Sequence, residues 1–163
     1  GGAVFMDFNK PHFDQHGHGS YESLSVSNLP PLFIAYRDIL AEGTEVTHND
    51  LRSRFNRGDK QVLAGIERWG QLAQEARNLI VAGKGREIGP LMEENFQLRA
   101  SLIKISPGNQ QLVDTGQAQG ASVKFAGSGG AVIGMYDGDP QRLERLKQAY
   151  ASIGAHFFIP DIA

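Results

Sequence analysis

The 163-residue chain contains no cysteine, which excludes a disulfide framework and thiolate metal sites and fits a reducing compartment. It has no large excess of charge either, because 16 Lys and Arg against 18 Asp and Glu leave a net charge of −2. No basic field is therefore present to gather nucleic acid or anionic lipid. No apolar run approaches the roughly 18 residues of a membrane span, and no signal peptide is visible. We expect a cytoplasmic protein that binds neither nucleic acid nor membrane.

What the chain does contain is typical of one globular domain. Its content of 40% hydrophobic and 21% charged residues is ordinary, and 163 residues are enough to bury a substantial core. The chain opens on GGAVFMDF, a strand-like apolar run without an initiator methionine. We therefore expect residues 1–163 to form a single domain cut from a longer protein.

Apolar patterning and turn residues predict strands near both ends of the chain, with helices between them. Strands are expected at 3–8, 21–24, 29–38, 121–126, 131–136 and 156–160. Helices are expected at 49–55, 59–83, 86–102, 107–119 and 140–153. The rest of 9–28 is predicted to be a polar loop. This order indicates an α+β layer, in which a mostly antiparallel sheet carries helices packed on one face.

The helix expected at 59–83 has a capping residue, Asp59, and one apolar stripe. We predict that this stripe is buried: Val62, Ile66, Trp69, Ala73, Ala76 and Ile80. A second stripe, on the helix at 86–102, consists of Ile88, Leu91, Asn95, Leu98 and Leu102.

Asn95 is the one polar member of that second stripe. A buried amide must be hydrogen-bonded, because leaving it unpaired costs about 1–3 kcal/mol. The sequence allows two roles for Asn95, and the favoured one is to bind the backbone of a loop. Alternatively, Asn95 faces a cleft and binds a polar substrate together with Arg99, one turn further along.

The stretch SVKFAGSGGAVIG, residues 122–134, places glycines between two predicted strands. A nucleotide-binding P-loop and a dinucleotide fingerprint both lead into a helix, so neither motif fits. Two interpretations remain. The loop is either a hairpin turn with more glycines than a tight turn needs, or a concave run of N–H groups that holds an anion.

Histidine, aspartate and arginine side chains are further candidates for a functional site. His12, His16 and His18 could meet one Zn²⁺, but solvated loop histidines are the favoured interpretation, and we expect no metal site. Asp7 and Asp14 are widely spaced and have no visible partner, so no catalytic role is assigned to them. A guanidinium fork matches a carboxylate, and a clamp for a sugar acid could come from any of four arginines. The sequence selects none among Arg52, Arg54, Arg86 and Arg99.

The glycine segment ASVKFAGSGGAVIG resembles the third signature motif of the GHMP kinases (galacto-, homoserine, mevalonate and phosphomevalonate kinases), usually K-L-T-G-A-G-G-G-G. The matching positions are Lys124, Gly127, Gly129 and Gly130, whereas Phe125, Ala126, Ser128 and Ala131 depart from the motif. GGAVFMDF, HGHGSYESL, LPPLFIAY, RSRFNRGD and LMEENFQLR occur in the order and spacing of the sugar-acid, glucuronokinase-like branch of the family. The resemblance covers nearly the whole chain, although only the glycine motif is highly specific.

The resemblance implies a ferredoxin-like C-terminal domain of a two-domain kinase that uses ATP and Mg²⁺ to phosphorylate a small sugar or sugar acid. It places Lys124 and the loop Gly127, Ser128, Gly129 and Gly130 beside the phosphates. The family's ATP-cradling second motif and its catalytic carboxylate would belong to an N-terminal domain upstream of Gly1. We therefore expect no catalytic residue within these 163 residues and no activity from them alone. The alternative is a non-catalytic ferredoxin-like module that binds a small anion or a partner.

A domain separated from its neighbour should keep an exposed apolar patch. The expected contributors are Val4, Phe5 and Phe8 in the opening strand, together with residues beside the glycine loop. In the isolated chain this face is expected to drive homodimerisation.

Overall fold

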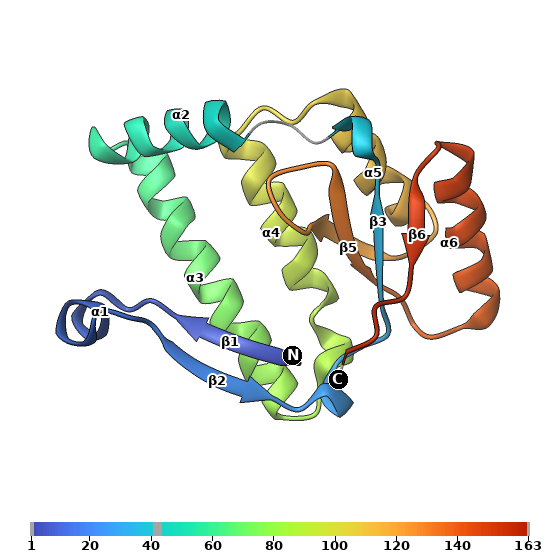
Figure 1. The fold of residues 1–163 in the computed structure, drawn as a ribbon, viewed down its shortest axis with the longest axis horizontal. Coiled ribbons are helices and arrows are strands. Elements are labelled where there is room, and N and C mark those ends of the chain that lie inside the picture. Colours follow the sequence, from blue (N-terminus) through green and yellow to red (C-terminus); the bar gives the residue numbers. More distant parts are fainter. Residues whose placement is uncertain (1, 41–43, 163) are drawn as a thin grey trace.

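The computed structural model describes residues 2–40 and 44–162, with the backbone alone for 44–49. Its strands are β1 (Ala3–Asp7), β2 (Ser20–Leu24), β3 (Leu32–Tyr36), β4 (Ser122–Phe125), β5 (Ala131–Met135) and β6 (His156–Phe158). Its helices are α1 (Lys10–His16), α2 (Thr44–Asn56), α3 (Lys60–Val81), α4 (Gly89–Leu102), α5 (Pro107–Gln117) and α6 (Pro140–Ser152). Short 3₁₀ turns are η1 (Val26–Asn28), η2 (Asp38–Leu40) and η3 (Gly85–Glu87). Figure 1 shows this arrangement.

The main sheet has four strands in the order β4-β5-β3-β6, and every neighbouring pair is antiparallel. The glycine hairpin joins β4 to β5, and α6 connects β5 to β6 across the sheet. This is the strand order of a ferredoxin-like layer. The predicted α+β class with an antiparallel sheet is confirmed.

One face of the sheet carries the larger core. Phe33 and Ala35 on β3, together with Val132 on β5 and Val123 on β4, point to this face and are buried. Helices α5 and α6 cover them, and the Tyr150 hydroxyl of α6 donates a hydrogen bond of 2.9 Å to the Leu112 carbonyl of α5. This buried bond ties the two covering helices together.

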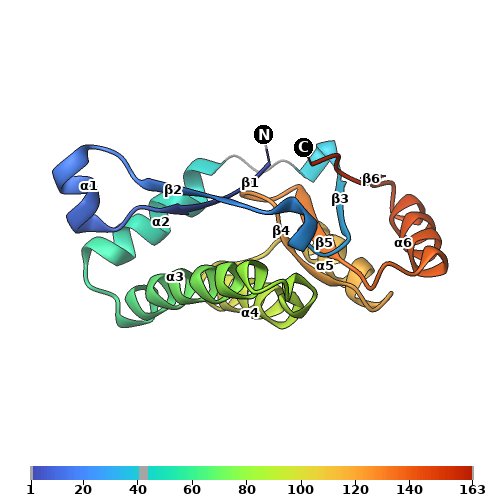
Figure 2. The same cartoon turned by 90° about the horizontal axis from the view of Figure 1, so that it is seen from below.

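Helices α3 and α4 form an antiparallel pair beside the sheet (Figure 2). At one end of this pair, Ile80, Ile88 and Met92 pack with Met135 in a second, smaller core. One turn along α4, Phe96 instead belongs to the larger core and meets Phe125 edge-on, with ring centroids 5.5 Å apart. Helix α4 therefore contributes to both cores.

Strands β1 and β2 pair only with each other and carry α1 at their tip, forming an arm beside α3 (Figures 1 and 2). Two Arg77 nitrogens on α3 donate to the two carboxylate oxygens of Glu22 on β2, at 2.9 and 2.7 Å. Arg77 thus holds the carboxylate in a bidentate grip, and this pairing lowers the pKa of Glu22. Helix α3 and the arm are joined by this ion pair.

Part of the region predicted to be a loop at 9–28 is helical, which corrects that prediction. Asn9 caps α1 by accepting a bond from the His12 N–H, and Gly17 ends the helix at a φ of +75°. Pro11 lies in the first turn, where the missing N–H is harmless. The helix also spans only 7 residues, too short for an apolar stripe to reveal it.

The predicted Asp59 cap is present, but the predicted stripes are only half correct. The Asp59 carboxylate accepts from the Gln61 and Val62 N–H groups at the start of α3. Val62 and Ile80 are buried as predicted, whereas Ile66 is 42% exposed. On α4, Leu102 is buried as predicted, but the other buried side chains are Met92 and Phe96, one position away from Leu91 and Asn95. The helix expected at 49–55 is longer and begins at Thr44.

Candidate functional site

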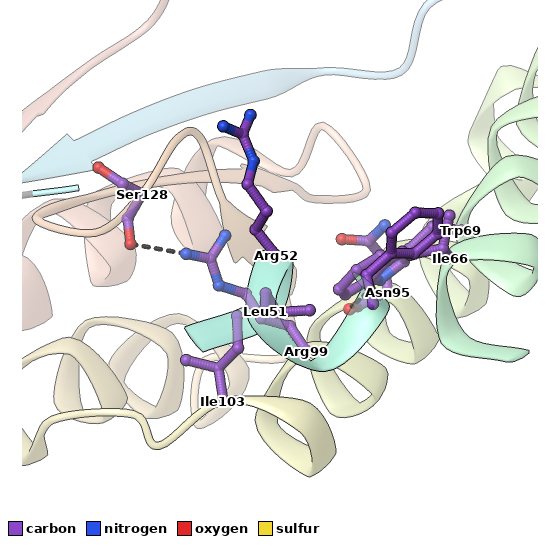
Figure 3. Close-up of a pocket in the computed structure, with 9 residues that line it drawn as sticks. Leu51, Arg52, Ile66, Trp69, Asn95, Arg99, Ile103 and Ser128 are labelled. Atoms are coloured by element: carbon purple, nitrogen blue, oxygen red, sulfur yellow. Dashed lines mark hydrogen bonds between the residues drawn. The ribbon is translucent and has the colours of Figure 1, made fainter. Parts of the chain in front are cut away.

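An open cleft of about 670 Å³ lies beside the glycine loop, bounded by α2, α3 and α4 (Figure 3). Its described lining residues are Leu51, Arg52, Phe55, Ile66, Trp69, Asn95, Arg99, Ile103 and Ser128. Its volume falls in the range of small-molecule sites, which are mostly apolar with a few convergent polar groups. Ile66 and Trp69, two members of the stripe on α3, therefore form part of the cleft wall.

The glycine loop, residues 127–130, connects the adjacent antiparallel strands β4 and β5, as predicted. Gly130 has a φ of +77°, which favours glycine at this position. The Gly130 N–H donates a buried 2.7 Å bond to Oδ1 of Asn109, which is 2% exposed. The Gly130 carbonyl accepts a hydrogen bond from the Arg37 N–H at 2.9 Å. The base of the loop is thus fixed from both sides.

The tip of the loop presents backbone N–H groups that could bind a ligand. Within the described residues, the N–H groups of Gly127, Ser128 and Gly129 have no hydrogen-bond partner. A Cβ atom on Gly129 would lie 3.0 Å from Asn109 Nδ2, so the backbone passes close to this side chain. Consecutive unpaired N–H groups of this kind can bind an anion.

Arg99 supports the opposite side of the loop. Its two terminal nitrogens donate to the carbonyls of Gly127 and Ser128, at 2.9 and 2.6 Å (Figure 3 draws the Ser128 bond). Its guanidinium carbon lies 4.9 Å from the centroid of the Phe125 ring, within cation–π range. Arg99 lines the cleft, but these contacts also make it a residue that shapes the loop.

Lys124 precedes the loop on β4 and is half-buried. Its ammonium donates to the Phe125 carbonyl at 2.9 Å. Burial, and secondly the charge of Arg99, lower the pKa of Lys124. Two cations are therefore held near the loop at an electrostatic cost, an arrangement that an anion would relieve.

Asn95 faces the cleft, as the second interpretation of its position required. Figure 3 shows Asn95 beside Trp69, and the Trp69 indole N–H donates a long 3.4 Å bond to the Asn95 carbonyl. Asn95 and Arg99 thus line one cleft with Ser128, and the cleft reaches the loop that Lys124 precedes. The structure therefore brings the predicted substrate residues and the predicted phosphate loop to one cleft.

The three histidines gather around the tip of the arm, remote from the cleft residues in sequence. The ring centroid of His12 lies 4.4 Å from that of His16 and 5.8 Å from that of His18. Across the described ranges 2–40 and 44–162, no group of three His, Asp or Glu side chains is arranged to hold a metal ion. Asp14 is paired with Lys10, and Asp7 accepts from the Asn9 N–H.

Sequence reasoning missed Asn109 and assigned Trp69 to the core. Asn109 follows Pro107 by two positions in the first turn of α5, where an asparagine is usually attributed to local capping. Its Nδ2 does donate to Ser106 Oγ at 3.1 Å, but its oxygen reaches the distant Gly130. No local signal distinguishes those two uses.

The family model "GHMP kinases C terminal" matches residues 72–157, just over half of the chain. The chain therefore belongs to this family of kinase C-terminal domains, and the resemblance seen in the glycine motif is confirmed. Among the helices of the described residues, none has both the length and the apolar character needed to cross a membrane.

Among known proteins, the chain is similar to "Glucuronokinase 1" of Arabidopsis thaliana, with 32% identity over 94% of this chain and 43% of that protein. "Probable glucuronokinase 2" of the same plant is also 32% identical, over 91% of this chain and 41% of its own length. The chain thus spans less than half the length of these relatives. Its fold matches that of L. major mevalonate kinase in complex with R-mevalonate, with a TM-score of 0.74, 15% identity, and coverage of 91% and 48% of the two chains.

Proposed function

We propose that these residues form the C-terminal domain of an ATP- and Mg²⁺-dependent kinase that phosphorylates a sugar or a sugar acid, as glucuronokinases do. The observation that carries the proposal is the glycine loop, which presents unpaired N–H groups beside a cleft of substrate size. The 32% identity to glucuronokinases over most of the chain supports the choice of acceptor. We also propose a cytoplasmic location, which the absence of cysteine fits.

The residues at the loop fit an anionic phosphate. The N–H groups of Gly127, Ser128 and Gly129 would contact it, and Lys124 would supply a nearby positive charge. In phosphoryl transfer, ATP supplies the phosphoryl group and Mg²⁺ neutralises charge on the phosphates. No described residue that lines the cleft is acidic, so the metal ligands would come from elsewhere. Arg99 would keep the loop in the shape that binds the phosphate.

The N-terminal half of the enzyme would supply the remaining machinery and cover the exposed face of the arm. Val4, Met6 and Phe8 are 44%, 57% and 57% exposed, while Phe5 is half-buried. Strands β1 and β2 make no hydrogen bonds to the main sheet. In the absence of the N-terminal half, the same face would support a homodimer, which light scattering across a range of concentrations would detect.

A coupled ADP-release assay tests the proposal on three samples: the 163 residues alone, a mixture with the N-terminal half, and the two halves as one chain. The panel contains glucuronate, galactose and related sugars and sugar acids. We expect no turnover from the 163 residues alone, because they contribute only part of the orientation that can carry about 7–11 kcal/mol of a barrier. The joined chain should be fully active.

Two results would contradict the proposal. Turnover by the 163 residues alone would show that the catalytic groups lie within them. Inactivity of the joined chain on the whole panel would instead favour a non-catalytic module that binds a small anion or a partner.

A further inference from the structure

We propose that Arg52 is the specificity-determining residue that binds the carboxylate of an acidic sugar, with the ring of that sugar lying against Trp69. This inference rests on the proposed function and names the group that would select an acidic acceptor over a neutral one. It follows from the cleft itself, which Arg52 of α2 lines together with Asn95 and Trp69 (Figure 3).

Of the arginines that could clamp a carboxylate, three are already engaged. Arg54 donates to the Asp59 carboxylate at 2.8 Å and to the Leu102 carbonyl at 2.7 Å. Arg86 donates to the Asp137 carbonyl at 2.7 Å and does not line the cleft. Arg99 uses both terminal nitrogens on the loop carbonyls.

Arg52 differs from these three. It lines the cleft, and within the described part of the chain it makes no hydrogen bond or ion pair. Its planar fork therefore remains available for two parallel bonds to a carboxylate. The charge at the cleft favours an anion as well, because Arg99 is the second cation there and no described lining residue is acidic.

The rest of the cleft suits a sugar ring better than a bare anion. Phe55, Ile66 and Trp69 form an apolar wall against which the C–H face of a pyranose can pack. The amide side chain of Asn95 can both donate and accept, as sugar hydroxyls require. A carboxylated sugar uses the wall, the amide and the guanidinium together.

An anion at Arg52 could also be a phosphate of the nucleotide. The carboxylate is favoured because the loop N–H groups and Lys124 already offer donors to a phosphate near Ser128. In Figure 3, Arg52 projects from α2 between Ser128 and Asn95, and Asn95 lies next to Trp69 of the apolar wall. The two sources of the anion predict different kinetic changes.

The test uses the full-length protein with Arg52→Gln, which removes the charge and keeps a similar length, and Arg52→Lys, which keeps the charge but loses the fork. Arg57→Gln is the matched control. Arg57 lies just beyond α2, donates to Ser53 Oγ at 2.6 Å, and does not line the cleft. Calorimetry measures binding of D-glucuronate and D-glucose, and steady-state kinetics give kcat and KM for each sugar and KM for ATP.

We expect Arg52→Gln to weaken binding of D-glucuronate about tenfold or more, which corresponds to about 1.4 kcal/mol. The effect should appear in KM for D-glucuronate, with kcat, KM for ATP and binding of D-glucose little changed. Arg52→Lys should recover part of the loss, and Arg57→Gln should behave as the unsubstituted protein.

Three results would overturn the assignment: D-glucuronate binding that does not depend on Arg52, equal losses for both sugars, or a change confined to KM for ATP. Absence of D-glucuronate binding to the unsubstituted protein would also overturn it. Failure of the proposed kinase function looks different, because binding of D-glucuronate would depend on Arg52 while no sugar was phosphorylated.

Discussion

Asn109 connects α5 to the glycine loop, and replacing it with alanine tests how the loop is held. The substitution removes the Oδ1 atom that accepts the 2.7 Å bond from the buried Gly130 N–H. It also removes the Nδ2 donor to Ser106 Oγ. Because Asn109 is 2% exposed, water cannot easily replace either partner. The loop would lose its buried anchor.

The expected size of the effect follows from these contacts. A buried N–H left without an acceptor costs about 1–3 kcal/mol. For a chain of about this length, 1 kcal/mol corresponds to a shift in Tm of about 2–4 °C. We therefore expect Asn109→Ala to lower Tm by about 2–12 °C and to lower the urea midpoint accordingly.

Urea unfolding followed by far-UV circular dichroism gives the change in free energy of unfolding, and hydrogen exchange of the Gly130 amide reports on the bond itself. Gln110→Ala is a suitable control, since Gln110 is the next residue on α5 and its side chain donates to Asp114 near the surface, at 2.7 Å. It should change stability by less than about 0.5 kcal/mol. If Asn109→Ala has an equally small effect and Gly130 keeps its protection, Asn109 does not hold the loop.

Three further predictions concern the loop and the arm. Gly129→Val should lower kcat/KM of the intact enzyme by more than about tenfold, or about 1.4 kcal/mol, because a side chain at residue 129 would crowd Asn109. Activity within about twofold of the original would contradict the role of the loop in the cleft. Lys124→Met should leave the free energy of unfolding unchanged or raise it, while turnover falls. The reason is that the pKa of Lys124 is lowered in the folded state, so its charge disfavours folding at neutral pH. Urea midpoints and kcat separate the two effects, and a clear loss of stability would refute the argument. The pKa of Glu22 is lowered in the folded state. Glu22 therefore stabilises the fold above its ordinary pKa of 4.5, and this stabilisation is lost as pH falls through the pKa of the folded state. Hydrogen exchange on β2 should therefore accelerate in that acidic window, and Glu22→Gln should remove this pH dependence.

The sequence predicted the strands and capped helices well, because the signals for them are local. Asp59 caps its helix as expected and accepts bonds from two N–H groups in the following turn. The glycine loop was also placed correctly between two adjacent strands. These features depend on residues within a few positions of one another.

What the sequence could not predict depends on contacts between distant segments. The apolar period of α3 is the same whether a side chain packs against another helix, as Ile80 does with Met92 of α4, or lines an open cleft, as Ile66 does. The four candidate arginines were indistinguishable until the structure showed that Arg54 bonds to Leu102, 48 positions away. Periodicity predicts which side chains share the apolar face of a helix, but not what that face contacts.

Helix α4 contacts both cores and also places Asn95 and Arg99 at the cleft, whereas the described residues of α2 that line the cleft are exposed or half-buried. The two helices should therefore differ in how freely they accept mutations. A change on α4 alters core packing as well as ligand contacts, so few substitutions there can be neutral for folding. A change at Arg52 or Phe55 alters the cleft with little effect on either core. Selection for a new acceptor sugar, in nature or in the laboratory, should accumulate its substitutions on α2 first.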